Sequence, residues 1–268
     1  MSILDLLQLR RYLAKEMSVT RILPTRSSLR NRIRQPLRRP YAALESAASS
    51  HIPAYYDALF RAYGPQHWWP GRTRFEVIVG AILTQNTSWS NVERATASLR
   101  REQLLSPAAI EQVPLVRLAR LIRSSGYFRQ KARKLKAFVG YLRERHAGSL
   151  TKLFATPTPE LREQLLAVHG IGPETADSIL LYAGRHPVFV VDAYTRRMLE
   201  RHGLANAKQT YQEIQELFQR NLPQDPALFN EYHALIVHNG KHFCGKRQPD
   251  CAQCPLRPFL PSGSEVRP

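Results

Sequence analysis

The stretch Leu166-Ala-Val-His-Gly-Ile-Gly-Pro-Glu-Thr-Ala-Asp-Ser-Ile-Leu180 decides the local fold of this 268-residue chain. Apolar residues at helical spacing stand on both sides of Gly170-Ile171-Gly172. The two glycines permit a tight turn, and Pro173 suits the first position of the following helix. We therefore predict two helices joined by a hairpin, with Ile171 packed back between them. A helix that begins in this way offers unpaired backbone N–H groups, which favour a phosphate.

Helical periodicity extends over most of the chain beyond residue 50. The predicted helices are Pro53–Tyr63, Arg74–Leu83, Asn91–Arg101, Leu115–Ser124, Arg129–Arg145, Pro159–Val168, Pro173–Ala183, Asp192–His202, Lys208–Leu222 and Ala227–His238. The short apolar run Pro187–Val191 is the one candidate strand. We therefore predict an all-α fold.

The composition favours a polyanionic partner. The chain holds 39 Lys and Arg against 21 Asp and Glu, a formal net charge of +18. Such an excess is typical of proteins that bind DNA, RNA or an anionic membrane surface. Residues 1–50 hold ten of the basic and three of the acidic side chains, and we predict that they form a disordered basic arm. No apolar run reaches the roughly 18 residues of a membrane-spanning helix, so we expect no span.

An aspartate stands twenty residues beyond Gly172, in Val190-Val-Asp-Ala-Tyr-Thr-Arg-Arg197. An aspartate between an apolar run and a helix is usually a helix cap. Asp192, however, follows a phosphate-binding hairpin and precedes two arginines, which also favours a functional carboxylate. Three cysteines, Cys244, Cys251 and Cys254, lie within eleven residues near the C-terminus. Their odd number and dense spacing suit metal ligation in a reducing compartment better than disulfides.

Together, the hairpin, the Asp192 segment and the cysteine loop resemble the helix–hairpin–helix (HhH-GPD) DNA glycosylases of endonuclease III type. The resemblance runs from about Pro53 to Pro261. It implies two helical domains with DNA in the groove between them: a six-helix barrel that carries the hairpin, and a domain of N- and C-terminal helices with the cysteine loop. We place the first at 72–185 and the second at 51–71 plus 186–261, followed by a tail, 262–268.

The resemblance also implies the chemistry. Asp192 corresponds to the catalytic carboxylate, which stabilises oxocarbenium charge on the sugar and orients the attacking water. The damaged base must first leave the stack. Bifunctional members carry a lysine two residues after the second hairpin glycine, where it forms a Schiff base and cuts the strand. That position is Glu174 here, and an acid cannot form the imine, so we predict a monofunctional enzyme.

The same comparison of motifs predicts the DNA contacts. Gln85 matches the glutamine that fills the gap in the duplex, although it could also be a surface amide. Tyr127 matches a second wedge. The hairpin (Gly170, Ile171, Gly172) would meet phosphate, as would Lys246 and Arg247 in the cysteine loop.

Three tryptophans indicate the substrate. Trp68 and Trp69 precede a rigid proline, and Trp89 lies close to Gln85 in the sequence. They could serve packing, but in a loop they can form a stacking slot, which suits a cationic alkylated purine. The pattern is similar to the 3-methyladenine DNA glycosylase III branch of the family. We therefore expect an alkylated purine such as 3-methyladenine.

The cysteine loop departs from the family pattern. Its fourth ligand position is Leu260, which cannot bind a metal. A [4Fe–4S] cluster with only three cysteine ligands, a metal-free loop and a zinc site completed by His242 are the alternatives.

Two other functions remain open at this point: a non-catalytic DNA-binding module, and a bifunctional glycosylase/lyase for oxidised pyrimidines that uses another lysine, such as Lys241. We expect a monomer that binds double-stranded DNA and no membrane. We expect it in the cytoplasm and nucleoid of a prokaryote, or in the nucleus or mitochondrion of a eukaryote.

Overall fold

The computed structural model describes residues 39–68 and 71–261, with side chains from Ser50 onward. The first 38 residues of the predicted arm, Trp69 of the predicted pocket and the predicted tail 262–268 lie outside the described residues. Residues 39–261 belong to one compact unit.

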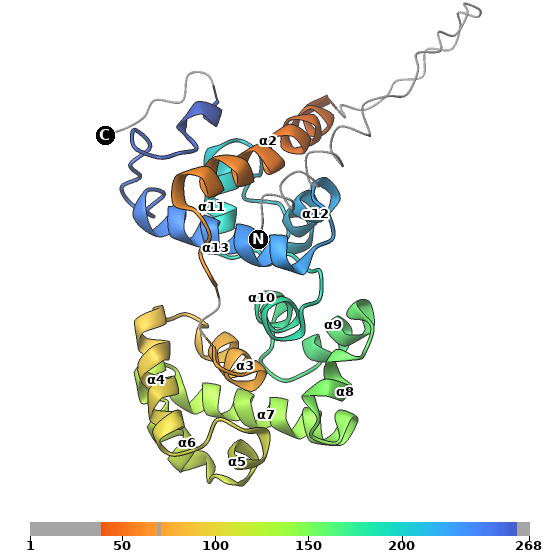
Figure 1. Ribbon diagram of the computed structural model, residues 1–268, viewed down its shortest axis with the longest axis vertical. Helices are drawn as coiled ribbons and strands as arrows, with labels where there is room; N and C mark the ends of the chain where they lie inside the picture. Colours follow the sequence, from red (N-terminus) through yellow and green to blue (C-terminus); the bar gives the residue numbers. More distant parts are fainter. Residues whose placement is uncertain (1–38, 69–70, 262–268) are drawn as a thin grey trace, which may run out of the picture. The chain divides into compact units, whose positions relative to one another are not determined.

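The described residues are helical and contain no strand, which confirms the all-α prediction (Figure 1). The α-helices are α2 (Arg39–Tyr63), α3 (Arg74–Leu83), α4 (Trp89–Arg101), α5 (Pro107–Gln112), α6 (Leu115–Leu121), α7 (Phe128–His146), α8 (Leu150–Phe154), α9 (Thr158–Leu166), α10 (Pro173–Ser178), α11 (Ala193–Arg201), α12 (Tyr211–Asn221) and α13 (Pro226–His242). Shorter elements are η1 (Arg123–Ser125), η2 (Ile179–Gly184), a π-helical continuation of α10, and η3 (Arg257–Phe259). None of these helices is long and apolar enough to cross a membrane.

The first helix begins earlier than the sequence analysis predicted. Helix α2 starts at Arg39, so residues 39–50 are helical and do not belong to a disordered arm. The stretch after Pro40 is rich in alanine, the residue with the highest helix propensity, and proline is well tolerated in a first turn. The basic arm therefore ends before residue 39.

The predicted strand Pro187–Val191 is wrong. Its residues have no strand partner among the described residues and run as an extended, largely buried segment between η2 and α11. Side-chain amides of α12 satisfy its backbone instead. Phe189 N donates to Gln219 Oε1 at 3.0 Å, and Gln215 Nε2 donates to Phe189 O at 2.6 Å. A buried segment can do without a β ladder when side chains pair its polar groups.

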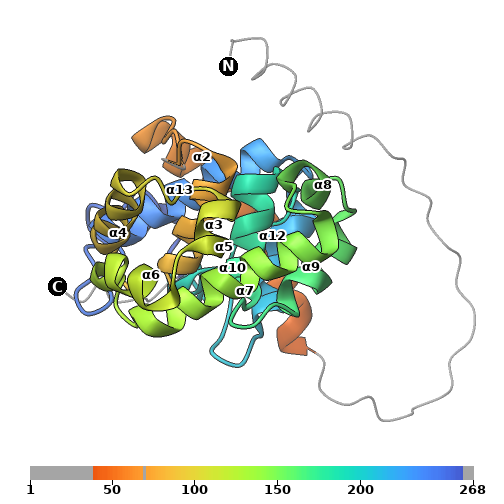
Figure 2. The same cartoon turned by 90° about the horizontal axis from the view of Figure 1, so that it is seen from below.

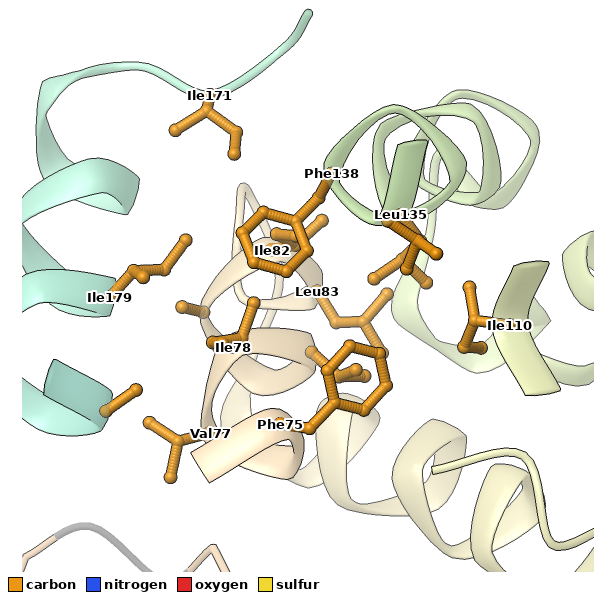
Figure 3. Packing of buried hydrophobic residues seen from close by; sticks show 14 of the residues in the cluster. Phe75, Val77, Ile78, Ile82, Leu83, Ile110, Leu135, Phe138, Ile171 and Ile179 are labelled. Carbon is orange, nitrogen blue, oxygen red and sulfur yellow. The ribbon is translucent and has the colours of Figure 1, made fainter. Parts of the chain in front are cut away.

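One hydrophobic core forms around α3. This helix is apolar on nearly every side, and all its residues after Arg74 are buried. Figure 3 shows Ile78, Ile82 and Phe138 of this core, with Ile171 of the hairpin and Ile179 of η2 nearby. The hairpin is therefore fixed by the packing of Ile171 as well as by its glycines, as the sequence predicted.

A second core joins α2 to the C-terminal helices. Figures 1 and 2 show α13 beside α2. Phe189 of the extended segment stacks on Phe218 of α12 at a centroid distance of 3.9 Å. Leu181 of η2 also belongs to this core, so the helix that leaves the hairpin contributes to both cores. This continuity places the start of α11, and thus Asp192, at a fixed distance from the hairpin.

A buried ion pair ties α9 and α10 to α12. Asp177 is fully buried and accepts hydrogen bonds from Arg162 Nε at 2.7 Å and Arg162 Nη2 at 3.0 Å. Gln215 Nε2 donates to the same carboxylate at 2.7 Å. Both carboxylate oxygens of Asp177 thus accept hydrogen bonds. The sequence analysis did not single out any of these three side chains.

Candidate active site and DNA-binding surface

Asp192 caps helix α11 with one oxygen, and its other oxygen takes no part in the cap. Its Oδ1 accepts from Thr195 N at 2.8 Å and Thr195 Oγ1 at 3.0 Å. The cap therefore fixes the side-chain rotamer, and the carboxylate is 13% exposed. The capping interpretation and the catalytic interpretation of Asp192 are compatible, since they use different oxygens.

A histidine and a tyrosine lie behind the second oxygen of Asp192. His233 Nε2 of α13 lies 3.6 Å from Asp192 Oδ2, and His233 Nδ1 lies 2.5 Å from the hydroxyl of Tyr182 in η2. Burial lowers the pKa of His233, although Asp192 opposes this. Burial, with Asp192 and Glu174 nearby, raises the pKa of the Tyr182 phenol well above its usual value. Sequence reasoning missed both residues because neither belongs to a short motif.

Glu174 lies in the first turn of α10, close to Asp192. Glu174 is an exposed residue. Even so, desolvation of its carboxyl by surrounding protein atoms, together with the charge of Asp192, raises the pKa of that carboxyl to about 7. The two carboxyls therefore interact, and Glu174 titrates near neutral pH. A second acid, and no amine, occupies the position of the family's lyase lysine.

Two of the three tryptophans of the predicted pocket lie close together. Trp68 and Trp89 have ring centroids 6.4 Å apart with planes inclined by 39°. Asn230 Nδ2 donates to Trp68 O at 2.9 Å, which ties the connection before α3 to α13. The Lys241 ammonium lies 5.7 Å from the centroid of the Trp68 ring, in a cation–π arrangement.

The three residues of the hairpin have different structural roles. Gly170 has φ +81°, and a Cβ there would lie 2.5 Å from the Lys134 side chain. Gly172 is the N-cap of α10 without a side-chain cap, and a Cβ there would meet nothing within 4 Å. The Ile171 side chain is only 4% exposed, and its N–H donates to Val168 O at 3.1 Å. Ile171 therefore serves packing, while the first backbone N–H groups of α10 have no partner within the helix.

Gln85, the predicted plug, is attached to the hairpin. Its Nε2 donates to Gly170 O at 3.1 Å and to Thr175 Oγ1 at 2.9 Å, and its Oε1 accepts from Lys134 Nζ. The side chain is thus held in place by protein contacts, and filling a duplex would exchange these contacts for contacts with bases.

The predicted plug and wedge lie at one pocket, lined by Gln85, Asn86, Tyr127, Gln130, Lys131 and Lys134. Tyr127 is 66% exposed and has φ +43°, and Asn86 has φ +53°. Positive φ in residues other than glycine is strained and concentrates at functional sites.

Lys131 is a buried support for this pocket. Its Nζ donates to Leu83 O at 2.9 Å and to Ser125 O at 2.5 Å. Burial, with Lys134 nearby, lowers its pKa to about 8. The end of α3, which precedes Gln85, is thereby tied to the loop that precedes Tyr127.

The cysteine loop is held by hydrogen bonds. Arg201 Nη1 donates to Cys244 Sγ at 3.1 Å, and Cys254 Sγ donates to Asn239 Oδ1 at 3.4 Å. Within the described residues, no group of three or more His, Cys, Asp or Glu side chains could hold a metal ion. With Leu260 at the fourth position, the loop offers three cysteine ligands instead of four, and His242 does not join them in such a group, so a [4Fe–4S] cluster with three cysteine ligands stays a prediction.

The two basic residues of this loop are exposed. Lys246 and Arg247 both face solvent, and the backbone carbonyl of Lys246 accepts from Arg201 Nη2 at 3.3 Å. Their predicted contact with phosphate stays a prediction.

Comparison with known proteins identifies the family of this chain. A profile of the HhH-GPD superfamily of base excision DNA repair proteins matches residues 79–224. A putative DNA repair glycosylase of Methanocaldococcus jannaschii is 48% identical over 206 residues, which are 76% of this chain and 93% of that protein.

Solved structures show the same fold. An endonuclease III trapped as a covalent DNA intermediate matches with a TM-score of 0.69 at 23% identity, over 79% of this chain and 94% of that chain. The 3-methyladenine DNA glycosylase of H. pylori, bound to 1,N6-ethenoadenine, matches with a TM-score of 0.59 at 27% identity, over 75% and 96% of the two chains.

The fold, the hairpin and the oriented carboxylate define a helix–hairpin–helix protein of base excision repair. The chain belongs to the HhH-GPD superfamily and is an endonuclease III-like DNA repair glycosylase. The predicted resemblance is confirmed.

Proposed function

We propose that this glycosylase is monofunctional and releases an alkylated purine, such as 3-methyladenine, from double-stranded DNA. The observation that carries the proposal is the pair of carboxyls, Asp192 and Glu174. One is oriented for hydrolysis, and the other stands where a Schiff-base lysine would be required for strand cleavage.

Asp192 supplies the charge for base release. When the N-glycosidic bond breaks, its electron pair leaves with the base and positive charge develops on the sugar. Asp192 Oδ2 stabilises that charge and accepts a proton from the water that attacks the anomeric carbon. A cationic alkylated purine leaves as a neutral base, so the reaction needs no separate acid.

The base pocket accounts for the choice of purine. Trp68 and Trp89, whose ring centroids lie 6.4 Å apart, offer electron-rich faces on which a flipped base can stack. Glu174, once ionised, adds negative charge close to Asp192. Both features favour a cationic base over a neutral oxidised pyrimidine.

The DNA-binding groups supply affinity and base flipping. Helix α7 carries Arg129, Arg133 and Lys134 close to the pocket that Tyr127 and Gln85 line. Backbone donors at the start of α10 suit a phosphate. We infer that duplex DNA crosses the groove between the two helical domains, with Gln85 and Tyr127 in place of the flipped base.

A panel of duplexes, each with one lesion, tests this function. We expect fastest release from 3-methyladenine duplexes, with strands intact until alkali is added. Trp89→Ala should slow this release by about tenfold to a hundredfold, the usual effect of losing one base–aromatic stack. The affinity of the Trp89→Ala variant for undamaged DNA should stay within twofold of the wild-type value. Faster release of thymine glycol, or of adenine opposite 8-oxoguanine, would contradict the alkylpurine assignment.

A bifunctional enzyme is the second candidate because Lys241 lies over the ring of Trp68. Borohydride trapping on abasic DNA separates the two functions. A monofunctional enzyme gives no covalent adduct, and Lys241→Gln then leaves strand cleavage at its background level. An adduct that Lys241→Gln abolishes would establish the lyase.

A further inference from the structure

Two polar side chains lie behind the candidate catalytic carboxylate. Tyr182 pairs with His233 Nδ1 at 2.5 Å, and His233 Nε2 lies 3.6 Å from Asp192 Oδ2. Within the described residues, His233 Nε2 has no partner within hydrogen-bond distance. Tyr182 belongs to η2 and His233 to α13, and the two residues stand 51 positions apart in the sequence.

The carboxylate fixes the polarity of this pair. An ionised carboxylate can only accept, so the neutral imidazole turns its N–H, on Nε2, toward Asp192. His233 Nδ1 is then an acceptor, and the Tyr182 hydroxyl donates to it. The neutral state agrees with the burial of the ring and with its T-shaped contact with Phe189.

We propose that Tyr182 and His233 are positioning residues that orient the catalytic oxygen of Asp192. Helix capping fixes Oδ1, and the Nε2–H of His233 faces Oδ2 at 3.6 Å, where its dipole favours this orientation of the carboxylate. The inference rests on the proposed function only in that Asp192 acts on the sugar, and it holds for any lesion that the enzyme releases.

A positioning role and a packing role predict different results for the loss of the Tyr182 hydroxyl. Tyr182 does not touch Asp192, yet loss of its hydroxyl leaves His233 Nδ1 without its donor. The imidazole can then move its proton to Nδ1, which turns a lone pair on Nε2 toward the carboxylate. Tyr182→Phe should therefore disturb catalysis through the tautomer, with little change in side-chain volume.

Kinetics give the first test. Single-turnover release is measured on the lesion that the wild-type enzyme prefers, and affinity is measured on a duplex with a stable abasic analogue. We expect Tyr182→Phe and His233→Leu to slow release about tenfold, the scale of one lost hydrogen bond in a dry site, with affinity within twofold. His233→Gln, which retains a donor, should recover most of the rate.

The chain supplies a matched control. Tyr55 and His202 form a second buried Tyr–His pair, with the hydroxyl 2.8 Å from Nδ1, in the second core. Tyr55→Phe removes the same hydrogen bond and should cost similar stability without slowing release. Equal slowing by Tyr55→Phe and Tyr182→Phe, at equal melting temperatures, would overturn the proposal.

A second measurement does not depend on activity. In protein with 15N-labelled histidine, the nitrogen shifts of His233 report which ring nitrogen carries the proton. We expect the Nε2–H tautomer in the wild type and a change toward Nδ1–H in Tyr182→Phe. An Nδ1–H tautomer in the wild type would contradict the proposal. If the protein released no lesion, the proposed function would be wrong. The tautomer of His233 would still test whether Tyr182 sets the orientation of the imidazole toward Asp192.

Discussion

Asp177 and Asp192 are carboxylates fifteen residues apart, on either side of η2, with opposite surroundings. Asp177 is fully buried, and Arg162 and Gln215 together occupy both its oxygens. Asp192 uses one oxygen to cap α11, and its other oxygen lies 3.6 Å from a neutral histidine.

The two carboxylates differ in the charge of their partners. Arg162 supplies a counter-charge to Asp177, and a carboxylate neutralised in this way has little charge to offer to a developing cation. The partners of Asp192 are a backbone N–H, a hydroxyl and a neutral imidazole, which orient it without a counter-charge. This difference supports the proposed catalytic role of Asp192 and a structural role for Asp177.

Asp192→Asn should have the largest effect. Asparagine caps a helix as well as aspartate does, so the melting temperature should change little. Base release should fall by about a thousandfold or more, because the amide cannot stabilise the oxocarbenium charge. Single-turnover kinetics and DNA affinity on the same protein check this, and affinity should stay within a few-fold. Release at the wild-type rate would remove Asp192 from the mechanism.

Asp177→Asn should act on stability instead. It leaves the guanidinium of Arg162 without its counter-charge, and Arg162 is partly exposed, so we expect about 3 kcal/mol of lost unfolding free energy. For a chain of this size, the melting temperature should fall by roughly 6–12 °C. Release per folded molecule, measured well below that temperature, should stay near the wild-type rate. A large loss of rate without a loss of stability would contradict the comparison.

Glu174→Gln tests the intermediate case of an exposed carboxyl with a perturbed pKa. Because its pKa is raised to about 7, Glu174 becomes charged as the pH rises through 7. Release of a cationic base should therefore increase several-fold between pH 6 and 8, and Glu174→Gln should flatten this increase. The stabilisation that the raised pKa provides is complete below about pH 4.5 and is lost as the pH rises through 7. A pH profile that is identical in the variant would exclude this role.

Chelation should have the smallest effect. Arg201 donates to the sulfur of Cys244, and Cys254 donates to Asn239, so we expect these protein contacts to hold the loop when a chelator is present. Treatment with a chelator should leave the melting temperature unchanged, as monitored by circular dichroism. Iron in the purified protein, with a fall in melting temperature when it is removed, would instead establish a three-cysteine cluster.

Much of the site follows from local sequence. The turn Gly170-Ile171-Gly172, the acid at Glu174 and the cap-like context of Asp192 are short-range features, and the structure places each in the predicted element. Apolar spacing likewise predicted helix α3 with its observed bounds. These predictions succeed because turn geometry and helix capping depend on neighbours within a few residues.

The rest was decided by tertiary structure. Helix α2 begins before the predicted end of the arm, and the run Pro187–Val191 is paired by glutamines of α12 rather than by a strand. The roles of Asp177 and His233 depend on Arg162 and Tyr182, which other elements bring to them. The sequence by itself determined which residues can turn, cap or carry charge. Only the folded chain decided which charges are neutralised, because that depends on burial and on partners far apart in the sequence.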